Sequence, residues 1–476
     1  MAEKLNLNKK DFPTWYDRIL AYADLLDDRY PVKGIYVWKP YGYKALKLML
    51  AEMERLLDST GHHEACFPSF VPSSVFEKES DFLKGFQGET LRITKVGKTE
   101  LDEELIVRPT SETIIYPMFS LWIRSWRHLP LKIYQTVPIF RWETKMTKAM
   151  LRVREIIKFK EAHTAHATAE EAEHQIKEAL AIYEEFFRFL KIPFIVLKTP
   201  KWDTFAGAVY NYDFFSIMPD GKAIELASVI NLGEKFSKAF DITFKDENEK
   251  TQRVHQTCYG ISERSLGSSL AIHGDDRGLI FVSTIAPVQT VIIPIPKGTE
   301  KERKELSKYV STIAKKLKKF RVVIDNSDSE RPGAKFYHWE TKGVPIRIEI
   351  GPKEMKSKEL VIVRRDTFEK IKIPEKNIAK EVKRIIEEID TNVYNKSKKF
   401  LNKMINVAKD IKDAKKILAS KGGIVRLPWC GTDKCGKEME KELVGQALGY
   451  DEHEKMVGKC KCGKKAKYHL NFGRTY

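Results

Sequence analysis

The stretch that most constrains the fold lies at residues 135–166, where the pattern predicts two long strands joined by a polar loop. Residues 135–142 are rich in β-branched and aromatic side chains, residues 144–149 form a basic connection, and residues 151–159 return to apolar character. Charges lie along both predicted strands, at Arg141, Glu143, Arg152, Arg154, Glu155 and Glu161. An unpaired charge is costly in a low-dielectric interior, so these groups need solvent or partners.

Two interpretations of this hairpin stay open on the residues alone. Charges of both signs are ordinary on the exposed face of antiparallel strands, which makes a solvated face one interpretation. The other is an anion site on a rigid sheet. The guanidinium of Arg141 suits a phosphate or a carboxylate, and a nearby Glu could fix its orientation.

Neighbouring motifs favour the second interpretation. FRWE at residues 140–143 follows VRPTSE at residues 107–112 and precedes LRVRE at residues 151–155. This arrangement resembles motif 2 of class II aminoacyl-tRNA synthetases, and the RPTSE form is similar to the prolyl-tRNA synthetases of the archaeal and eukaryotic branch. The resemblance implies a proline–tRNA ligase, which uses ATP to attach L-proline to tRNA(Pro) through a prolyl-adenylate.

The resemblance also implies a division into three domains. Residues 1–287 would form an α+β catalytic domain on an antiparallel sheet, with motifs 1, 2 and 3. Residues 288–400 would form an α/β anticodon-binding domain, and residues 401–476 a small C-terminal zinc-binding α/β domain. A chain of 476 residues suits two or three domains on length alone.

Composition agrees with a nucleic-acid partner in a reducing compartment. The formal charge is +18, from 84 Lys plus Arg against 66 Asp plus Glu, which indicates a polyanionic partner or a generally basic surface. The first residues lack an apolar signal core, and the longest uncharged apolar run, residues 281–296, is shorter than the ~20 residues of a membrane span. Six cysteines are too few for a disulfide scaffold. We therefore expect a cytoplasmic protein without membrane segments.

Motif 1 is expected near the N-terminus. Residues 14–27 and 41–60 carry apolar side chains at helical spacing, and a strand containing Pro68 follows the second helix. In the resembled family such a helix and strand lie at the interface of a homodimer. The alternative is a helix that packs within its own domain.

A proline pocket is expected around the helix that PTSE opens. This sequence is typical of a helix start with a hydroxyl cap. In the family, the positions of Thr110 and Glu112 hold the imino group of the substrate, and Glu112 supplies the opposite charge. Phe159 and Phe205 resemble apolar walls, with core packing as the alternative. Cys258 resembles a small lining residue, although a single Cys is commonly just a buried thiol.

The resemblance assigns the nucleotide to three arginines and several polar residues. Arg141 would contact the α-phosphate of ATP, and Arg152 and Arg264 the distal phosphates. Glu143 would orient an arginine or lie beside the adenine, and Mg²⁺ would neutralise the polyphosphate. Gly260, Ser262 and Arg264 resemble motif 3 in its expected order along the chain.

Two positions depart from the pattern of the family. Residues 212–218 and 222–230 flank a PDG turn and predict a hairpin. On it, Glu225 replaces a Gln that reads adenine in many members, and Ile230 replaces a His near the proline ring. Glu225 can accept a hydrogen bond from the adenine amino group but cannot donate one. Ser228 matches a hydroxyl that commonly contacts the nucleotide.

Residues 288–365 alternate strands and helices as βαβ units do, which predicts an open sheet wrapped by helices. PGAKFYHWETKGVPIRIEIGPKE, from residue 332, resembles the anticodon-binding domain of the prolyl, threonyl, histidyl and glycyl enzymes. Proteins usually read RNA sequence on unstacked bases. Glu340, Arg347 and Glu349 are therefore candidates for base contacts, with surface ion pairing as the alternative.

The last segment carries the most specific metal pattern. Cys430 and Cys435 form C-x4-C, and Cys460 and Cys462 form C-x-C. Four cysteines in two close pairs favour a tetrahedral, structural Zn²⁺ over disulfides or free thiols. The family's zinc domain ends in Tyr, as Tyr476 does here, and its terminus reaches toward the active site. His163 and His166 have metal-like spacing but are more simply interior histidines.

Two rival functions stay open. A threonyl-tRNA synthetase shares the anticodon fold but would need an active-site metal held by Cys and His near motif 2, where no matching cysteine occurs. A catalytically inactive tRNA-binding paralogue would explain Glu225 and Ile230. Retention of Arg141, Arg152 and Arg264 argues against it.

Overall fold

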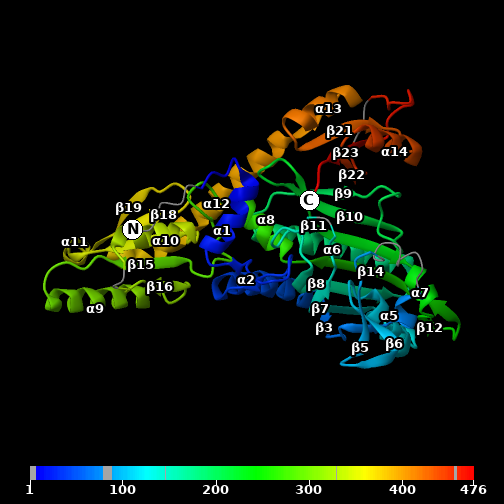
Figure 1. Cartoon of the computed structure of the whole chain (residues 1–476), viewed down its shortest axis with the longest axis horizontal. Helices are drawn as coiled ribbons and strands as arrows, with labels where there is room; N and C mark the ends of the chain where they lie inside the picture. The colour runs from blue at the N-terminus through cyan, green and yellow to red at the C-terminus, as the bar shows by residue number, and fades with distance from the viewer. Residues whose placement is uncertain (1–6, 79–87, 145, 328–329, 455–457) are drawn as a thin grey trace.

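The computed structural model describes residues 7–78, 88–144, 146–327, 330–454 and 458–476. Figure 1 shows an elongated molecule in which a broad central sheet has an α/β unit at one end and a smaller unit, formed by the last residues, at its upper edge. The first strand of the α/β unit, β15, begins at Thr290. The chain thus has the α+β core and the two α/β units that the sequence predicts.

An eleven-stranded sheet is the central element of the structure. In spatial order its strands are β20 (Ile405–Val407), β21 (Ile424–Trp429), β23 (Tyr468–Gly473), β22 (Gln446–Tyr450), β9 (Ile195–Lys198), β10 (Tyr210–Ile217), β11 (Ala223–Gly233), β14 (His255–Ile261), β8 (Glu155–His166), β7 (Leu131–Phe140) and β3 (His63–Glu64). The strands from β9 to β7 are mutually antiparallel, whereas β3 pairs with β7 in parallel.

Four helices share one hydrophobic core with this sheet, and one of them, α8, has no exposed residue. They are α1 (Phe12–Tyr22), α2 (Pro40–Asp58), α6 (Ala169–Phe189) and α8 (Arg264–His273). The side chains of Met49 and Met53 in α2 are fully buried in this core. The hydroxyl of Thr168 caps α6 by accepting a hydrogen bond from the Glu171 amide at 3.1 Å.

The central hairpin is present, but its strand bounds differ from the prediction: β7 spans Leu131–Phe140 where residues 135–142 were expected. The second strand was expected to resume at residue 151, but β8 begins at Glu155. The reason is a tight turn: the amide of Lys148 donates to the carbonyl of Arg152 at 2.7 Å, and Met150 has a positive φ of 58°. This turn takes the chain out of the sheet and redirects Arg152.

Smaller elements flank the sheet on the side of β7. A three-stranded sheet of β4, β6 and β5 lies beside α5, which carries Glu112. The remaining elements before residue 288 are β1 (Leu26–Asp27), β2 (Val37–Trp38), β4 (Phe70–Pro72), α3 (Ser73–Phe76), β5 (Leu91–Val96), β6 (Thr99–Val107), α5 (Glu112–Trp122), η1 (Trp126–His128), α7 (Lys235–Ala239), β12 (Thr243–Lys245) and β13 (Thr251–Arg253).

The α/β unit contains a five-stranded mixed sheet in the order β16-β15-β17-β18-β19, with helices on both faces. Its elements are β15 (Thr290–Pro294), α9 (Glu300–Lys316), β16 (Val322–Ile324), α10 (Pro332–Thr341), β17 (Ile346–Ile350), α11 (Pro352–Ser357), β18 (Glu359–Arg364), β19 (Lys370–Pro374), η2 (Glu375–Asn377) and α12 (Ile378–Met404). The pairs β15–β16 and β15–β17 are parallel, as βαβ connections require.

The last unit extends the central sheet instead of standing apart from it. Along the chain, α13 (Ile411–Ser420) follows β20 and α14 (Asp433–Glu442) follows β21, and β22 meets β9 at Tyr450 and Lys198. A small core joins the two regions, with Phe215 from β10, Leu401 from α12 and Leu448 from β22. The predicted boundary at residue 400 falls inside α12, which runs unbroken from the α/β unit to this core.

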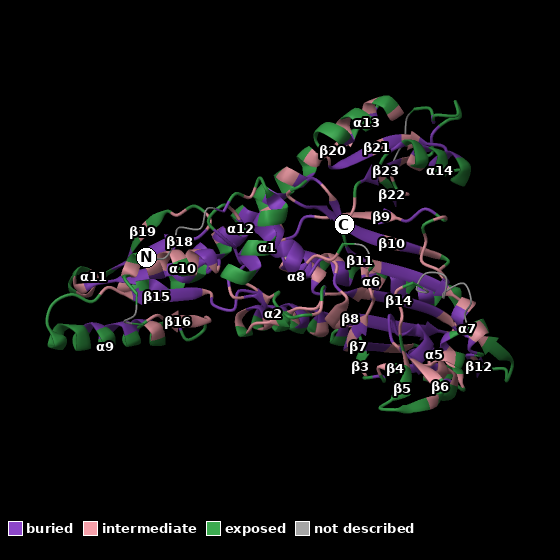
Figure 2. Cartoon of the chain, viewed as in Figure 1, coloured by how far each residue is buried: buried purple, intermediate pink, exposed green. Residues whose placement is uncertain are grey.

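Burial follows this layering (Figure 2): the strands of the central sheet are largely buried, and the outer faces of α9, α13 and α14 are exposed. Across the described ranges, the structure contains no helix long and apolar enough to cross a lipid bilayer.

Candidate active site

A cavity of about 260 Å³ opens on the uncovered face of the central sheet. It lies where β8, β11 and β14 run side by side and where α5 and α8 begin. The predicted residues that line it are Thr110, Glu112, Arg141, Phe159, Phe205, Glu225, Ser228, Cys258, Ser262 and Arg264. The fold therefore brings together ten residues that span 155 positions of the sequence.

One end of the cavity is acidic. Glu112, only 4 % exposed, begins α5, and the hydroxyl of Thr110 donates a hydrogen bond to its carboxylate. Burial raises the pKa of Glu112, and the nearby Glu161 carboxylate adds to the effect. A cationic amine placed here would stabilise the ionised form of Glu112.

A second buried carboxylate supports this end and was not assigned to the site from the sequence. Glu161 on β8 accepts hydrogen bonds from Ser111 and from Gln135 Nε2 at 2.8 Å, and it lies 3.2 Å from His163 Nε2. Burial alone would raise the pKa of Glu161, but these hydrogen bonds hold it below its usual value. The predicted hydroxyl cap of α5 is wrong, because the Ser111 hydroxyl serves Glu161 and makes no capping bond.

The other end of the cavity is basic. Arg141 Nε donates to the carbonyl of Pro109 at 2.9 Å, and its guanidinium lies 5.8 Å from the centre of the Phe159 ring. Burial lowers the pKa of Arg141, and the neighbouring Arg264 lowers it further. Two half-buried cations whose charges act on each other favour an anion between or beside them.

Backbone carbonyls fix Arg264 in the same way. Its Nε donates to the carbonyl of Leu151 at 3.0 Å, and its Nη1 donates to the carbonyl of Glu225 at 3.2 Å. The Ser262 hydroxyl accepts a hydrogen bond from the Arg264 amide at 3.1 Å. The guanidinium is therefore held by neutral acceptors, and no carboxylate neutralises its charge in these contacts.

A second cavity of about 410 Å³ adjoins the first, and both are lined by Phe205, Glu225, Ser228, Ile230 and Arg264. Arg152 and Glu143 line the second cavity and pair with each other, with Arg152 Nε 2.7 Å from Glu143 Oε2. The three predicted arginines thus face one continuous space. Glu143 orients Arg152, which agrees with one of its two expected roles.

The two positions that depart from the family lie at the junction of the cavities. Ile230 is 9 % exposed and presents an apolar side chain to both. Glu225 is exposed, and its carboxylate accepts a hydrogen bond from the Ser228 hydroxyl at 3.3 Å. Glu225 therefore lies where an incoming hydrogen-bond donor could reach it.

Sequence reasoning missed Asp213 on β10, which lines the second cavity. Asn211 Nδ2 donates to its carboxylate at 2.8 Å, and the Thr199 hydroxyl donates to it as well. Burial and the nearby Glu225 raise the pKa of Asp213 to about 7. An acid in the apolar run NYDFF could have been noticed, because a charge inside a buried strand needs partners.

The end of the chain closes the second cavity, as expected. The amide of Ala223 donates to the carbonyl of Arg474 at 2.7 Å, so the last residues run along the start of β11. Tyr476 lines the cavity, its hydroxyl donates to Asp220 at 2.8 Å, and Lys222 lies 4.7 Å from the centre of its ring.

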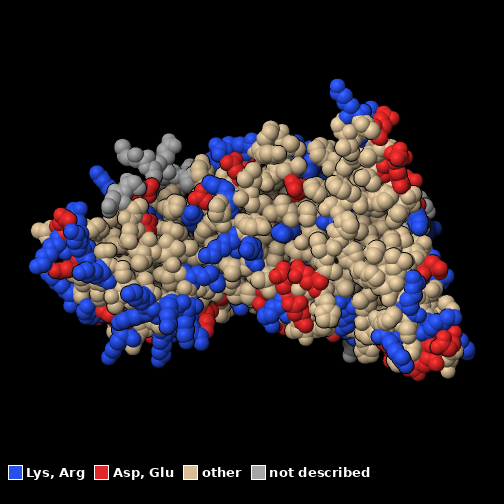
Figure 3. Space-filling model, turned by 90° about the horizontal axis from the view of Figure 1, so that it is seen from below, with Lys and Arg blue, Asp and Glu red and all other residues tan. Residues whose placement is uncertain are grey.

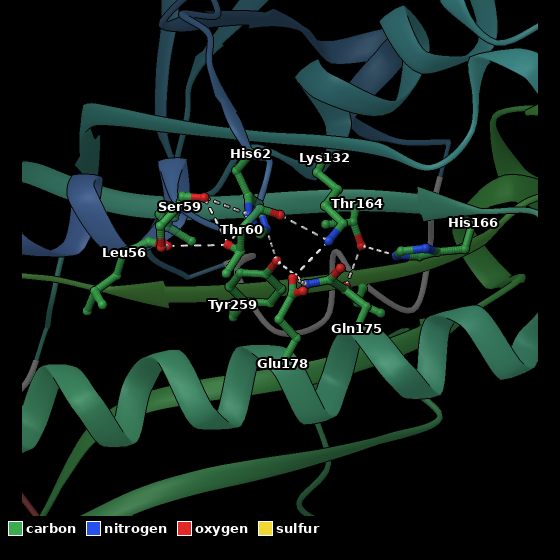
Figure 4. A network of polar contacts seen from close by, with 12 residues as sticks. Leu56, Ser59, Thr60, His62, Lys132, Thr164, His166, Gln175, Glu178 and Tyr259 are labelled. Carbon is green, nitrogen blue, oxygen red and sulfur yellow. Dashed lines mark hydrogen bonds and ion pairs between the residues drawn. The ribbon is translucent and has the colours of Figure 1, made fainter.

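A buried polar network supports β14 from the opposite side of the sheet (Figure 4). The Tyr259 hydroxyl accepts from Gln175 Nε2 at 3.0 Å and donates to His62 Nε2. Lys132 Nζ lies 2.8 Å from Glu178 and donates to the carbonyl of Thr60 at 3.3 Å. Since Tyr259 lies between Cys258 and Gly260, this network fixes the strand whose other face lines the first cavity.

This network predicts acid sensitivity. Burial, with Lys132 nearby, lowers the pKa of His62 to about 4, whereas the unfolded chain titrates near 6.5. Stability is therefore complete above about pH 6.5 and is lost as pH falls toward 4. Lowering the pH from 7 to 5 should reduce the free energy of unfolding in both proteins. We expect this reduction, measured by urea unfolding, to be about 2 kcal/mol smaller in His62→Gln than in the unsubstituted protein. An identical pH dependence in both proteins would contradict this assignment.

His163 and His166 are interior histidines with protein partners. His163 Nδ1 lies 2.9 Å from the Tyr116 hydroxyl, and His166 Nε2 lies 2.8 Å from the Thr164 hydroxyl. Neither belongs to a group of potential metal ligands among the described residues. The interpretation of both residues as interior histidines, made from the sequence, agrees with this environment.

Four cysteine thiols converge in the last unit. The Sγ atoms of Cys430, Cys435, Cys460 and Cys462 all lie within 4.8 Å of one another. The distance from Cys462 Sγ to Cys430 Sγ is 3.8 Å. A tetrahedron with Zn–S bonds of ~2.3 Å has sulfur atoms about 3.8 Å apart, so the four thiols fit a zinc ion.

The three candidates for base contacts form one ion-pair cluster in the α/β unit. Arg347 lies 2.6 Å from Glu340 and 3.0 Å from Glu349, and Lys370 lies 3.0 Å from the other oxygen of Glu349. Arg347 and Glu349 are each 8 % exposed. Base recognition by these residues stays a prediction. It would require RNA bases to replace some of the ion-pair contacts within the cluster.

Comparison with known proteins covers all three units. The class II core domain of the G, H, P, S and T tRNA synthetases matches residues 94–273, and an anticodon-binding domain matches residues 289–385. The C-terminal domain of prolyl-tRNA synthetases matches residues 411–476. A proline–tRNA ligase of Thermococcus kodakarensis is 45 % identical, over 100 % of both chains. The chain belongs to the prolyl-tRNA synthetase family.

Other prolyl-tRNA synthetases agree over the full length. The enzyme of Aeropyrum pernix is 42 % identical over 98 % of each chain. The Giardia lamblia prolyl-tRNA synthetase, solved in complex with prolyl-adenylate, superposes with a TM-score of 0.96, at 35 % identity over 99 % of this chain and 100 % of that one. The fold and the family that the sequence predicted are therefore confirmed.

Proposed function

We propose that the chain attaches L-proline to tRNA(Pro) in two steps. The proline carboxylate first attacks the α-phosphorus of ATP, forming prolyl-adenylate and releasing pyrophosphate. A terminal ribose hydroxyl of the tRNA then attacks the acyl carbon and releases AMP. One observation carries the proposal: an acidic pocket and three guanidinium groups face one continuous space on the sheet.

Each end of this space suits one part of the substrates. Thr110 and Glu112 would hold the cationic imino group, and Phe159, Phe205 and Cys258 would enclose the ring. Arg141 would contact the proline carboxylate and the α-phosphate. Arg152 and Arg264 would bind the distal phosphates, while Glu143, Glu225, Ser228 and Ser262 would contact the nucleotide. The carboxylate and the adenylate are already reactive, so catalysis would rest on positioning and on stabilising charge at phosphorus.

A magnesium ion would accompany ATP and neutralise its phosphates. The donor set fits this ion, because carboxylate oxygens of Asp213 and Glu225 line the second cavity and Mg²⁺ prefers oxygen ligands. In the α/β unit, Glu340, Arg347 and Glu349 would read anticodon bases.

A structural Zn²⁺ would be held by Cys430, Cys435, Cys460 and Cys462. We expect a chelator to release about one zinc per chain and to expose residues 401–476 to limited proteolysis. Adenylate formation should fall much less, because the three arginines and Glu112 lie in other elements. Metal analysis, proteolysis and pyrophosphate exchange on the same sample measure this difference. Loss of exchange before proteolysis would contradict a purely structural role.

We also infer a homodimer in the cytoplasm, where tRNA charging serves translation. The inner face of α2 is buried in its own core, so a partner would contact the outer face of α2 or the neighbouring small sheet. Apolar side chains near that sheet support this placement, since Phe70, Leu121 and Trp122 are 52 %, 57 % and 43 % exposed. Sedimentation at micromolar concentration, showing a species of twice the chain mass, would test it.

Amino-acid-dependent exchange of pyrophosphate into ATP tests the proposed function directly. We expect exchange with proline and none with threonine. Exchange with threonine alone would favour the threonyl enzyme, and no exchange with any amino acid would favour an inactive tRNA-binding paralogue.

A further inference from the structure

Helix α9 presents a straight row of lysines to solvent. Lys301, Lys304, Lys308 and Lys315 are all exposed, at spacings of three, four and seven residues. These spacings place the four side chains on one face of an α-helix, over a length of about 21 Å. Figure 3 shows Lys and Arg gathered on this side of the molecule, at the end formed by the α/β unit.

The opposite face of α9 is already used by the fold. Leu306, Val310 and Ile313 are buried in the core of the α/β unit. The lysine face therefore lacks the apolar stripe that a helix lying on a membrane needs, and it lacks the aromatic anchors common at protein interfaces. Its surface chemistry is that of a row of point charges.

Three of the four lysines form no ion pair with the part of the chain that the structure describes. Lys304 pairs with Glu300 at 2.7 Å, whereas Lys301, Lys308 and Lys315 form no ion pair with any described residue. Like charges three or four residues apart destabilise a helix by a few tenths of a kcal/mol per pair. Glu305, which is exposed four residues after Lys301 and three before Lys308, reduces this repulsion in part, and an external polyanion would offset the remainder.

The lysine row and the predicted base-contact residues lie on opposite faces of the five-stranded sheet. In β17, Ile346, Ile348 and Ile350 point into the core that contains α9. Side chains alternate along a strand, so Arg347 and Glu349 point to the other face, on which α10 packs. An anticodon loop held by Arg347 would therefore not touch the lysine row at the same place.

We propose that the lysine row of α9 is a second RNA-binding surface, which contacts phosphodiester backbones without reading bases. Lysines on flexible stems match phosphates as point charges, and phosphate contacts supply sequence-independent affinity. Base recognition would need aromatic or amide side chains beside the row, and α9 exposes neither. This surface goes beyond charging of tRNA(Pro), because any structured RNA presents the same backbone.

The test compares two triple variants of equal charge in the full-length protein. The first is Lys301→Gln, Lys308→Gln and Lys315→Gln. The matched control is Lys98→Gln, Lys177→Gln and Lys250→Gln, whose lysines are exposed, form no ion pair with described residues, and lie outside the α/β unit. The probe is a 16-base-pair RNA duplex of mixed sequence, without a proline anticodon, titrated at several KCl concentrations.

We expect the α9 variant to bind the duplex at least 10-fold more weakly at low salt. The slope of log K against log salt should fall in magnitude by about 2 to 3, near 0.9 per lost phosphate contact. The control should bind within about 2-fold of the unsubstituted protein. Unchanged duplex binding by the α9 variant would overturn the proposal, as would an equal loss in both variants, which would reflect net charge alone.

Two further measurements distinguish RNA binding from membrane binding and from misfolding of a variant. The first is binding to vesicles of phosphatidylserine and phosphatidylcholine. If the α9 variant binds these vesicles more weakly than the unsubstituted protein does but binds the duplex equally well, the surface serves membranes and the RNA proposal fails. Proline-dependent pyrophosphate exchange should be equal in all three proteins, which verifies their folding. Absence of exchange in the unsubstituted protein would count against the proposed function. The duplex titration would still test whether the lysine row binds RNA.

Discussion

Replacing Arg141 by Ala should lower the rate of prolyl-adenylate formation by roughly 10²- to 10³-fold, as removal of one preorganised transition-state donor does. The carbonyl of Pro109 and the ring of Phe159 hold this guanidinium in place before any substrate arrives. It therefore needs little reorganisation when charge develops at the α-phosphorus. Proline-dependent pyrophosphate exchange measures the loss.

Arg141→Lys is the matched variant, since it keeps the charge but removes the fork that holds two acceptors at once. We expect it to recover only a small part of the lost rate. A melting temperature close to that of the unsubstituted protein would verify the fold of both variants. Unchanged exchange kinetics in Arg141→Ala would refute the role of this residue.

Replacing Glu112 by Gln should raise the KM for proline by about 10- to 100-fold, since a buried hydrogen bond to a charged group contributes ~1.5–3 kcal/mol. Glu112 has almost the same shape as Gln, so the cavity and the Thr110 contact are expected to persist. The substitution removes only the negative charge of Glu112 that would lie opposite the imino group of proline. The KM for ATP should change little, because the guanidinium groups are untouched.

The pH dependence gives an independent check on Glu112. Burial raises the pKa of this carboxyl in the free protein, so protonation as pH falls removes the charge that binds proline. The KM for proline should rise toward acidic pH in the unsubstituted protein and stay flat in Glu112→Gln. Parallel pH profiles for the two proteins would exclude Glu112 as the amine-binding group.

Local patterns predicted most elements because single stretches encode them. Helix α6, for example, has an apolar face and a Thr cap within its own sequence. The connection before β8 was predicted too short, because its continuation to residue 154 depends on how Lys148 and Arg152 meet and not on the propensity of either residue. The hydroxyl cap of α5 was wrongly predicted for a similar reason, since the Ser111 hydroxyl bonds to Glu161, which lies 50 residues away in the sequence.

Site residues divide in the same way. Arg141 and Arg264 were identifiable because each belongs to a short motif. Asp213 belongs to no such motif, and its environment arises only when β9, β10 and β11 pair and bring Thr199, Asn211 and Glu225 together. Sequence patterns identify groups that act through their own chemistry, whereas groups defined by neighbours from other strands need the fold.

The small core shared by Phe215, Leu401 and Leu448 has a practical consequence for dissecting this chain. A fragment that stopped before residue 401 would lose apolar partners of β10 and would leave β9 as an open sheet edge. Unpaired edges recruit strands from other molecules, so such a fragment would tend to self-associate in solution.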